Sequence, residues 1–436
     1  MKRRSIVPST VGLGLAVAML AGCSGTPEQS AGPVKLDFWY SATGVPADTL
    51  VALVEEFNAA HDDVTINAIF QGQYEESMAK LANAVQGGEL PALIQGGDTF
   101  STYLRDSGLT VPPGEVKNLD GKTFDDSDLV PVLANYYTFD GELSSIPIMV
   151  SQPVILYNTA VLQAAGIDPA KPPKTLDELF EVATKLQQSS GKAGFTTFVD
   201  QWWPEQFSAS EGIAYCTPDN GVGAEAATGF SYTSDRQVDL WQQVQDLVAS
   251  GAMLNVGSDG GAALNAFVAG EAALMLQSSR IYGDATKAAG FEFGAWPLPI
   301  DSSKGGAVPG GNSVWLVKEG SSEGELAAAA SFAEFLASPQ SQSRIFTETG
   351  YLPSSKQALD ELSGSVTPTQ DVLLEQLKGT TDSVASAGCH TGAMGEARKL
   401  AKGAVEEIFG GADVTQALQK AQDGGDKAIS EYNVRK

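Results

Sequence analysis

Two adjacent tryptophans are the side chains most suggestive of a binding surface in this sequence. Trp202 and Trp203 stand in a polar stretch that runs from Asp200 to Gln206. Because two neighbouring indoles cannot both face the same core, we expect one of them to face a cleft. Flat aromatic faces stack on sugar rings and attract cationic groups. The pair therefore predicts a site for a sugar or for a cationic head group.

Further aromatic residues stand where strands are expected to end. Trp39, Tyr40, Tyr74 and Tyr351 occupy such positions, and ligands of open α/β sheets bind at strand ends. Each of these residues, taken singly, is explained as well by a place in the core. Together they favour a ligand cleft that is lined by aromatic rings.

Residues suited to an anion are fewer. Gly310-Gly311-Asn312-Ser313 offers backbone N–H groups with little side-chain obstruction, and such a turn can hold an anion. Arg398 carries a guanidinium, which suits bidentate contact with phosphate. An exposed surface arginine explains Arg398 equally well, so these residues leave an anionic ligand open without establishing one.

No catalytic centre is marked out. The only histidines are His61 and His390, which argues against a Ser-His-Asp triad or a histidine-based metal site. Asp98 and Glu75 could serve as the acid and base of a glycosidase, but their positions fix no separation. The sequence contains neither a P-loop nor a GxSxG motif. We therefore expect a binding protein rather than an enzyme, with no cofactor and no metal.

The N-terminus has the pattern of a bacterial export signal. Basic residues at positions 2–4 precede an apolar run over residues 11–21, which leads into Leu-Ala-Gly-Cys ending at Cys23. The run is shorter than the roughly 18 residues that span a bilayer, so it is typical of a signal peptide. We expect a lipoprotein signal over 1–23, with lipid on Cys23, and a flexible tether over 24–33. The alternative is a plain signal peptide with a chance cysteine. Either reading places the protein outside the cytoplasm, and the first anchors it to the cell membrane.

Composition narrows the possible partners. The chain has 436 residues and a formal net charge of −26. So acidic a surface argues against nucleic acid and against electrostatic docking on anionic lipid. Besides Cys23, the cysteines are Cys216 and Cys389. An even pair in an oxidising compartment favours a disulfide, with two buried thiols as the alternative.

The spacing of apolar residues predicts an α/β fold. It predicts, in order, strand, helix, strand, helix and strand over residues 34–39, 48–60, 64–70, 74–85 and 92–95. This order is typical of a doubly wound parallel sheet. The roughly 410 residues beyond the signal are too many for one ordinary core and suit two lobes. The Gly-rich stretch 302–311 is either a crossing between lobes or an ordinary surface loop.

Several short segments carry a family resemblance. Phe38-Trp39 ends the first expected strand and Phe57-Asn58 lies in the following helix. The other segments are Val154-Ile155-Leu156-Tyr157-Asn158, Ala164-Ala165-Gly166, Pro172-Pro173-Lys174-Thr175, Phe267-Val268-Ala269-Gly270-Glu271-Ala272-Ala273 and Thr349-Gly350-Tyr351-Leu352-Pro353. With them, the chain from about Leu36 to its end resembles the extracellular solute-binding proteins of ABC importers. The resemblance implies two doubly wound α/β lobes joined by hinge crossings, the type II periplasmic-binding-protein fold.

Other segments narrow the resemblance to one branch. They include Gln71-Gly72-Gln73-Tyr74-Glu75, Gln277-Ser278-Ser279 and Gly310-Gly311-Asn312-Ser313-Val314-Trp315. The branch they resemble binds sn-glycerol-3-phosphate and glycerophosphodiesters such as glycerophosphocholine. The resemblance implies that Tyr74 and Asp98 hold the glycerol hydroxyls, and that Trp202 or Trp203 lines the place of a choline-like group. It implies that glycerol and phosphate are surrounded by Ser151, Ser278 or Ser279, Gly311, Tyr351 and Arg398.

The chain departs from that branch at two positions. Asp98 stands where a glutamate is expected, so its reach is shorter by one methylene. Arg280 follows Ser279 where small residues are expected, and it could add a phosphate contact or fill the pocket differently. A neutral di- or oligosaccharide therefore remains the alternative ligand, and it would need more aromatic stacking and no Arg398.

The resemblance also implies how the chain divides. The N-terminal lobe would comprise residues 34–146 and 312–348, and the C-terminal lobe 147–311 and 349–436. Such lobes close over a ligand by a hinge motion, and a membrane permease recognises the closed form. We expect a monomer.

Overall fold

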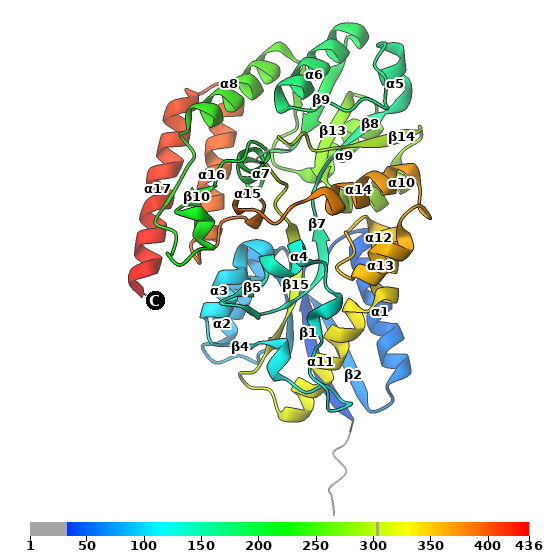
Figure 1. The fold of residues 1–436 in the computed structure, drawn as a ribbon, viewed down its shortest axis with the longest axis vertical. Coiled ribbons are helices and arrows are strands. Elements are labelled where there is room, and N and C mark those ends of the chain that lie inside the picture. Colours follow the sequence, from blue (N-terminus) through cyan, green and yellow to red (C-terminus); the bar gives the residue numbers. More distant parts are fainter. Residues whose placement is uncertain (1–32, 302–304, 436) are drawn as a thin grey trace, which may run out of the picture. The chain divides into compact units, whose positions relative to one another are not determined.

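The protein is described by a computed structural model that covers residues 33–301 and 305–435. Cys23, the expected signal and the expected tether up to residue 32 lie outside the described residues. From Pro33 onward the chain forms one compact unit. This unit is built on two large β-sheets, which occupy the lower and upper halves of Figure 1. We call each sheet with its helices a lobe.

The first sheet has six strands and is mixed. Its spatial order is β2 (Val64–Phe70), β1 (Val34–Tyr40), β3 (Leu93–Gly97), β15 (Gly310–Val317) and β4 (Thr110–Val111), and β7 (Ile146–Ser151) also pairs with β15. β1, β2 and β3 are parallel, whereas β15 is antiparallel to β3, β4 and β7. The predicted strand and helix order of this lobe is confirmed. The sheet is not wholly parallel because the chain returns to it as β15 in the opposite direction.

Helices cover this sheet where apolar residues recur at helical spacing. In α1 (Val45–Ala60), the buried side chains include Leu50, Leu53, Val54 and Phe57. Burying each such side chain contributes about 1.5–3 kcal/mol. The other main helices of the first lobe are α2 (Tyr74–Ala84), α11 (Glu323–Ala337) and α12 (Pro339–Thr349).

The second sheet has five strands. Its spatial order is β12 (Met253–Asn255), β9 (Ala193–Thr197), β13 (Ala272–Ser278), β8 (Pro153–Asn158) and β14 (Phe293–Pro297). β12, β9 and β13 are parallel, and β8 is antiparallel to β13 and β14. All seven residues of β13 are buried, as expected for a strand covered on both faces. The main helices of the second lobe are α6 (Leu176–Ser190), α8 (Asp235–Ser250), α16 (Met394–Phe409) and α17 (Val414–Arg435).

The first two crossings between the sheets lie a few residues away from the lobe boundaries that the resemblance implied. β7 pairs with β15 of the first sheet as far as Ser151, and β8 of the second sheet begins at Pro153. The first crossing is therefore at Gln152 rather than after residue 146. The return crossing lies between Pro297 and Gly310, because Gly310 already pairs with Ser151. Apolar spacing could not reveal this, since it shows that a segment is extended but not which sheet it joins.

Shorter elements complete the described chain. They are the helices α3 (Ser101–Asp106), α4 (Pro131–Tyr136), α5 (Thr159–Ala164), α7 (Trp203–Ser210), α9 (Gly260–Val268), α10 (Tyr282–Ala288), α13 (Lys356–Leu362), α14 (Pro368–Gly379) and α15 (Val384–Ala387), the 3-10 turns η1 (Asp98–Phe100), η2 (Pro113–Glu115), η3 (Asp126–Asp128), η4 (Asp219–Gly221) and η5 (Ser279–Ile281), and the two-residue strands β5 (Thr138–Phe139), β6 (Glu142–Leu143), β10 (Cys216–Thr217) and β11 (Gly229–Phe230). Among the described residues, no helix is both long enough and apolar enough to cross a membrane.

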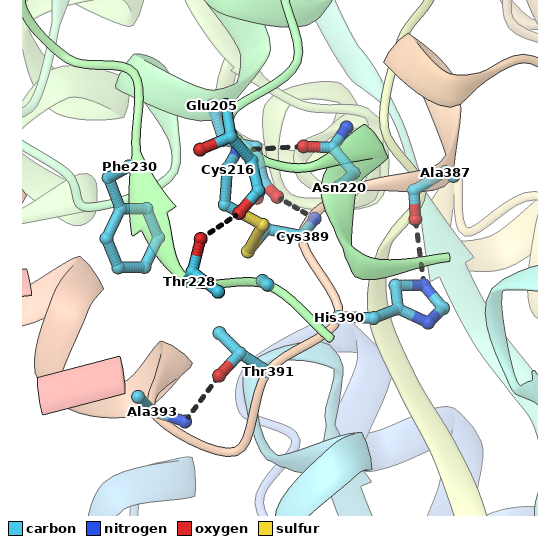
Figure 2. The surroundings of a disulfide bond; sticks show 12 residues. Glu205, Cys216, Asn220, Thr228, Phe230, Ala387, Cys389, His390, Thr391 and Ala393 are labelled. Atoms are coloured by element: carbon cyan, nitrogen blue, oxygen red, sulfur yellow. Dashed lines mark hydrogen bonds between the residues drawn. A yellow bond between two sulfur atoms is a disulfide. The ribbon is translucent and has the colours of Figure 1, made fainter. Parts of the chain in front are cut away.

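A disulfide joins Cys216 to Cys389 (Figure 2), with a Cα–Cα distance of 5.7 Å. Cys216 begins β10, which pairs with β11, and Cys389 precedes α16. The backbone N–H of Cys389 also donates to Glu205 Oε1 at 3.0 Å. The bridge thus ties the β10–β11 hairpin to the segment that leads into α16.

Candidate functional site

A cleft of about 590 Å³ lies where strand ends of the two lobes meet. Asp98 follows β3 and Ser151 ends β7 on the first-lobe side, while Phe198 follows β9 and Ser278 ends β13 on the second-lobe side. Ligands of open α/β sheets bind beyond the carboxyl ends of the strands. The cleft is therefore the candidate binding site.

The cleft brings together nine of the eleven residues that the sequence predicted for ligand contact. They are Tyr74, Asp98, Ser151, Trp202, Ser278, Arg280, Gly311, Tyr351 and Arg398. These residues come from segments spread over more than 300 positions of the chain, so only the fold makes them neighbours. Trp203 and Ser279 do not line the cleft, and neither do Trp39 and Tyr40.

Trp203 and Ser279 are buried behind the cleft wall. The indole Nε1 of Trp203 donates to the backbone oxygen of Phe198 at 2.9 Å. Ser279 is 1% exposed, and its backbone N–H donates to Gln152 O at 2.8 Å. Each follows directly after a residue that does line the cleft. The resemblance named two adjacent candidates at each of these places, and burial now separates them.

Trp202 forms part of the cleft wall, and glycine makes room for its ring. A Cβ atom on Gly310 would lie 2.6 Å from the indole, so only glycine allows this approach. The ring centroids of Trp202 and Trp203 are 5.6 Å apart, and both rings belong to the core cluster of the second lobe. The premise that two adjacent tryptophans cannot share one core is therefore wrong. Trp202 packs against that core and still borders the cleft.

Tyr74 is held by a buried polar network. Its hydroxyl accepts a hydrogen bond from Asn312 Nδ2 at 2.8 Å, and Asn312 Oδ1 accepts from Gln95 Nε2 at 2.9 Å. The ring lies on the backbone of Gly97, where a Cβ would come within 2.7 Å of it. Burial raises the pKa of Tyr74 well above its ordinary value. The phenol therefore keeps its proton.

Arg398 is buried between two carboxylates rather than exposed on the surface. Its side chain is 3% exposed, and Nη2 forms ion pairs with Asp98, at 2.8 Å, and with Glu205. Nη1 donates to Thr99 Oγ1 at 3.1 Å. Burial raises the pKa of Asp98 and of Glu205, and the Arg398 charge opposes this rise in both. The interpretation of Arg398 as a solvated surface arginine is therefore wrong. The residue links the first lobe, at Asp98, to the second lobe, at Glu205.

Five buried donors of the cleft residues have no hydrogen-bond partner among the described residues. They are Ser41 Oγ, Trp202 Nε1, Gln277 Nε2, Ser278 Oγ and Arg398 Nε. Buried polar groups are nearly always paired, so an unpaired group calls for an explanation. Donors gathered in one cleft are suited to an oxygen-rich ligand, such as a phosphate or a polyol.

Sequence reasoning missed several lining residues. Gln277, Asp200 and Lys402 line the cleft but were not assigned to it. Sequence position could have indicated two of these residues. Asp200 is two residues before Trp202, and Lys402 is one helical turn after Arg398. Burial raises the pKa of Asp200, whereas the hydrogen bond from the Trp202 backbone N–H and the Arg398 and Lys402 charges oppose that rise.

The residues weighed for catalysis are not arranged as an acid–base centre. Glu75 Oε1 accepts a hydrogen bond from Gln201 Nε2 at 3.1 Å, while Asp98 pairs with Arg398. Neither histidine is among the residues that line the cleft. His61 stacks on Phe57 with ring centroids 4.0 Å apart, and His390 is partly buried, with its ring centroid 5.6 Å from that of Tyr136. These side chains thus have structural contacts in the part of the chain that the structure describes.

Known proteins resemble this chain in sequence and in fold. The sn-glycerol-3-phosphate-binding periplasmic protein UgpB of Rhizobium meliloti is 30% identical over 413 residues, covering 92% of this chain and 95% of that protein. The UgpB protein of Mycobacterium tuberculosis, solved in complex with glycerophosphocholine, is 24% identical, covers 92% of this chain and 99% of that chain, and has a TM-score of 0.76. The GacH receptor of Streptomyces glaucescens, solved unliganded and with acarbose, is 20% identical, covers 91% and 99%, and has a TM-score of 0.77.

The structural likeness establishes the fold, two α/β lobes of the type II periplasmic-binding-protein kind. The family described as bacterial extracellular solute-binding protein matches residues 52–376. This match spans well over half of the chain, and the similarity to the Rhizobium meliloti protein extends over nearly all of it. The chain therefore belongs to the bacterial extracellular solute-binding protein family.

Proposed function

We propose that this chain is the substrate-binding protein of an ABC importer and captures a glycerophosphodiester or sn-glycerol-3-phosphate in the cleft. The relative from Rhizobium meliloti is an sn-glycerol-3-phosphate-binding protein, and it is similar to this chain over nearly its full length. The observation that carries the proposal is the cleft itself, where nine of the residues expected around such a ligand lie together.

The donors of the cleft suit the glycerol phosphate part of such a ligand. Ser278 Oγ, Gln277 Nε2 and Arg398 Nε are unpaired among the described residues, and phosphate oxygens accept hydrogen bonds strongly. Tyr74 adds a protonated phenol.

Other residues of the cleft suit a cationic head group. Trp202 and Phe198 provide aromatic side chains, and Asp200 and Glu75 provide carboxyl groups. A cation over an aromatic face gains about 0.5–2 kcal/mol, more when it is desolvated. This combination favours a diester such as glycerophosphocholine over a neutral sugar.

The remaining steps concern delivery. The lobes close over the ligand by a hinge motion at the crossings, and a membrane permease receives the ligand from the closed, monomeric protein without any chemical conversion. Cys23 carries the lipid that keeps the protein at the outer face of the cell membrane. The support for this anchor is the sequence pattern before Cys23.

A thermal-shift panel on the purified mature protein tests the ligand. Glycerol-3-phosphate and glycerophosphocholine should each stabilise it, by about 2.7 kcal/mol at 100 times the dissociation constant, whereas glycerol, maltose and maltotriose should not. Tyr74→Phe should reduce the shift, and Tyr103→Phe, which removes a hydroxyl from a 37% exposed ring, is the matched control. A shift with the sugars and none with the phosphates would replace the proposal with the neutral oligosaccharide alternative.

A further inference from the structure

Three cationic side chains reach the cleft, and they differ in their partners. Arg398 lies between Asp98 and Glu205, so its charge is already balanced by two carboxylates. Arg280 and Lys402 line the same cleft and form no ion pair with any residue that the structure describes. Among the cationic side chains of the cleft, Arg280 and Lys402 are therefore the two whose charge no carboxylate already pairs with.

The surroundings of these two residues separate their roles. Lys402 lies close enough to Asp200 for its charge to oppose the rise that burial causes in the pKa of Asp200. Arg280 lies close enough to Tyr74 and Tyr351 for its charge to affect the pKa of both phenols. Burial raises the pKa of both phenols, and the Arg280 charge opposes that rise in both. Arg280 is thus the cation beside the hydroxyl donors.

The acid nearest to Arg280 in sequence does not neutralise it. Asp284 lies one helical turn further on, in α10, where it could pair with Arg280. Instead, its Oδ1 accepts a hydrogen bond from the backbone N–H of Val45 in the first lobe, at 3.3 Å. Arg280 is only partly buried, which keeps its guanidinium accessible from the cleft.

We infer that Arg280 supplies the charge that selects an anionic ligand, whereas Arg398 supplies a hydrogen bond and holds Asp98 in place. The inference rests on the proposed function, since it assigns the anionic group of that ligand to one side chain. An anion that approaches Arg398 also meets the charges of Asp98 and Glu205, and like charges at such distances repel. An anion that approaches Arg280 meets a cation that forms no ion pair, beside the phenols of Tyr74 and Tyr351. The charge of Asp98 reaches both phenols and that of Asp284 reaches Tyr351, but neither carboxylate is paired with Arg280. Arg398 is therefore a positioning residue that also donates through Nε.

Salt-dependent titration of the mature protein with glycerol-3-phosphate and with glycerophosphocholine tests the inference. Arg280→Gln should lower the affinity for both ligands about 30-fold, as expected for losing one charge-assisted contact. It should also make the affinity less dependent on salt. Arg280→Lys keeps the charge and should retain most of the affinity and the salt dependence. Arg435→Gln removes an arginine charge at an exposed position near the C-terminus and should behave like wild type.

The outcomes separate this inference from the proposed function. Wild-type affinity and salt dependence in Arg280→Gln, with a loss of salt dependence in Arg398→Gln, would overturn it and return the anion to Arg398. Equal losses of ligand affinity in Arg280→Gln and Arg280→Lys, with unchanged salt dependence, would also overturn the inference. The side chain would then act through its shape rather than its charge. Failure of the wild-type protein to bind either phosphate ligand would instead refute the proposed function, before any variant is compared.

Discussion

At the scale of single residues, the cleft combines unpaired donors with a guanidinium that is already paired. The donors of Trp202, Gln277 and Ser278 have no partner among the described residues, whereas Arg398 holds two carboxylates. Ligand selection and structural support are thus assigned to different side chains. Two substitutions test this division.

Trp202→Ala should weaken the binding of glycerophosphocholine by about 1–2 kcal/mol, because the indole is expected to face the cationic head group. Trp39→Ala is the matched control, since Trp39 is a partly buried tryptophan that does not line the cleft. Titration calorimetry on both variants, checked for folding by circular dichroism, measures the change. Equal affinities in Trp202→Ala and wild type would remove this residue from the site.

Arg398→Ala should destabilise the fold by about 3–5 kcal/mol, because it leaves buried carboxylates without a counter-charge. The loss should be greatest near neutral pH and smaller in mild acid, since burial raises the pKa of both Asp98 and Glu205 and the protonated forms need no partner. Urea unfolding measures it. Arg435→Ala breaks only an exposed pair and should change stability by less than about 0.5 kcal/mol. A comparably small change in Arg398→Ala would contradict the buried network.

At the scale of elements, the sequence predicted what depends on local spacing. The first strands and helices of the first lobe were predicted because their apolar residues recur with a regular period, as Leu50, Leu53 and Phe57 do in α1. The crossing at Gln152 and the antiparallel course of β15 depend on pairings between distant segments, which periodicity does not encode.

The residues of the site fall into the same two groups, those that local sequence identifies and those that only distant contacts define. Tyr74, at the start of α2, and Ser278, at the end of β13, could be named because the family resemblance covers them. The burial of Arg398 could not, because it depends on Glu205, 193 positions away in sequence. Nor could local patterns separate Ser278 from Ser279, since that choice depends on which side chain the fold buries.

The segment before α16 should respond to acid through His390. Burial lowers the pKa of His390 to about 4, from an ordinary 6.5. Because the unfolded chain takes up this proton first, the associated stability is present above pH 6.5 and is lost as the pH falls towards 4, by about 3 kcal/mol. Urea unfolding from pH 4 to 8 should show a shallower decline in His390→Gln than in wild type. Parallel declines would contradict the buried, neutral imidazole.

At the scale of the whole molecule, the cleft lies between two lobes that several side chains connect. Arg398 reaches Asp98 across it, Gln201 reaches Glu75, and the Tyr432 hydroxyl of α17 donates to Asp106 at 2.5 Å. Helices α16 and α17, at one side of Figure 1, thus join the second lobe to the first. A ligand that adds contacts from both lobes stabilises the closed arrangement by its differential affinity for it.

The membrane tether is tested on the full chain. Cys23→Ser should abolish lipid attachment, so that the protein is either released or retained as an uncleaved precursor. Detergent partitioning of the expressed protein distinguishes these forms from the lipid-anchored wild type. A variant that partitions into detergent and is processed like wild type would contradict the anchor.

Isothermal titration of the mature wild-type protein tests the central claim most directly. We predict saturable one-to-one binding of glycerophosphocholine or glycerol-3-phosphate, weakened by salt because a partly exposed charge contributes, and no heat of binding with maltotriose. Binding of maltotriose without any response to either phosphate ligand would contradict it.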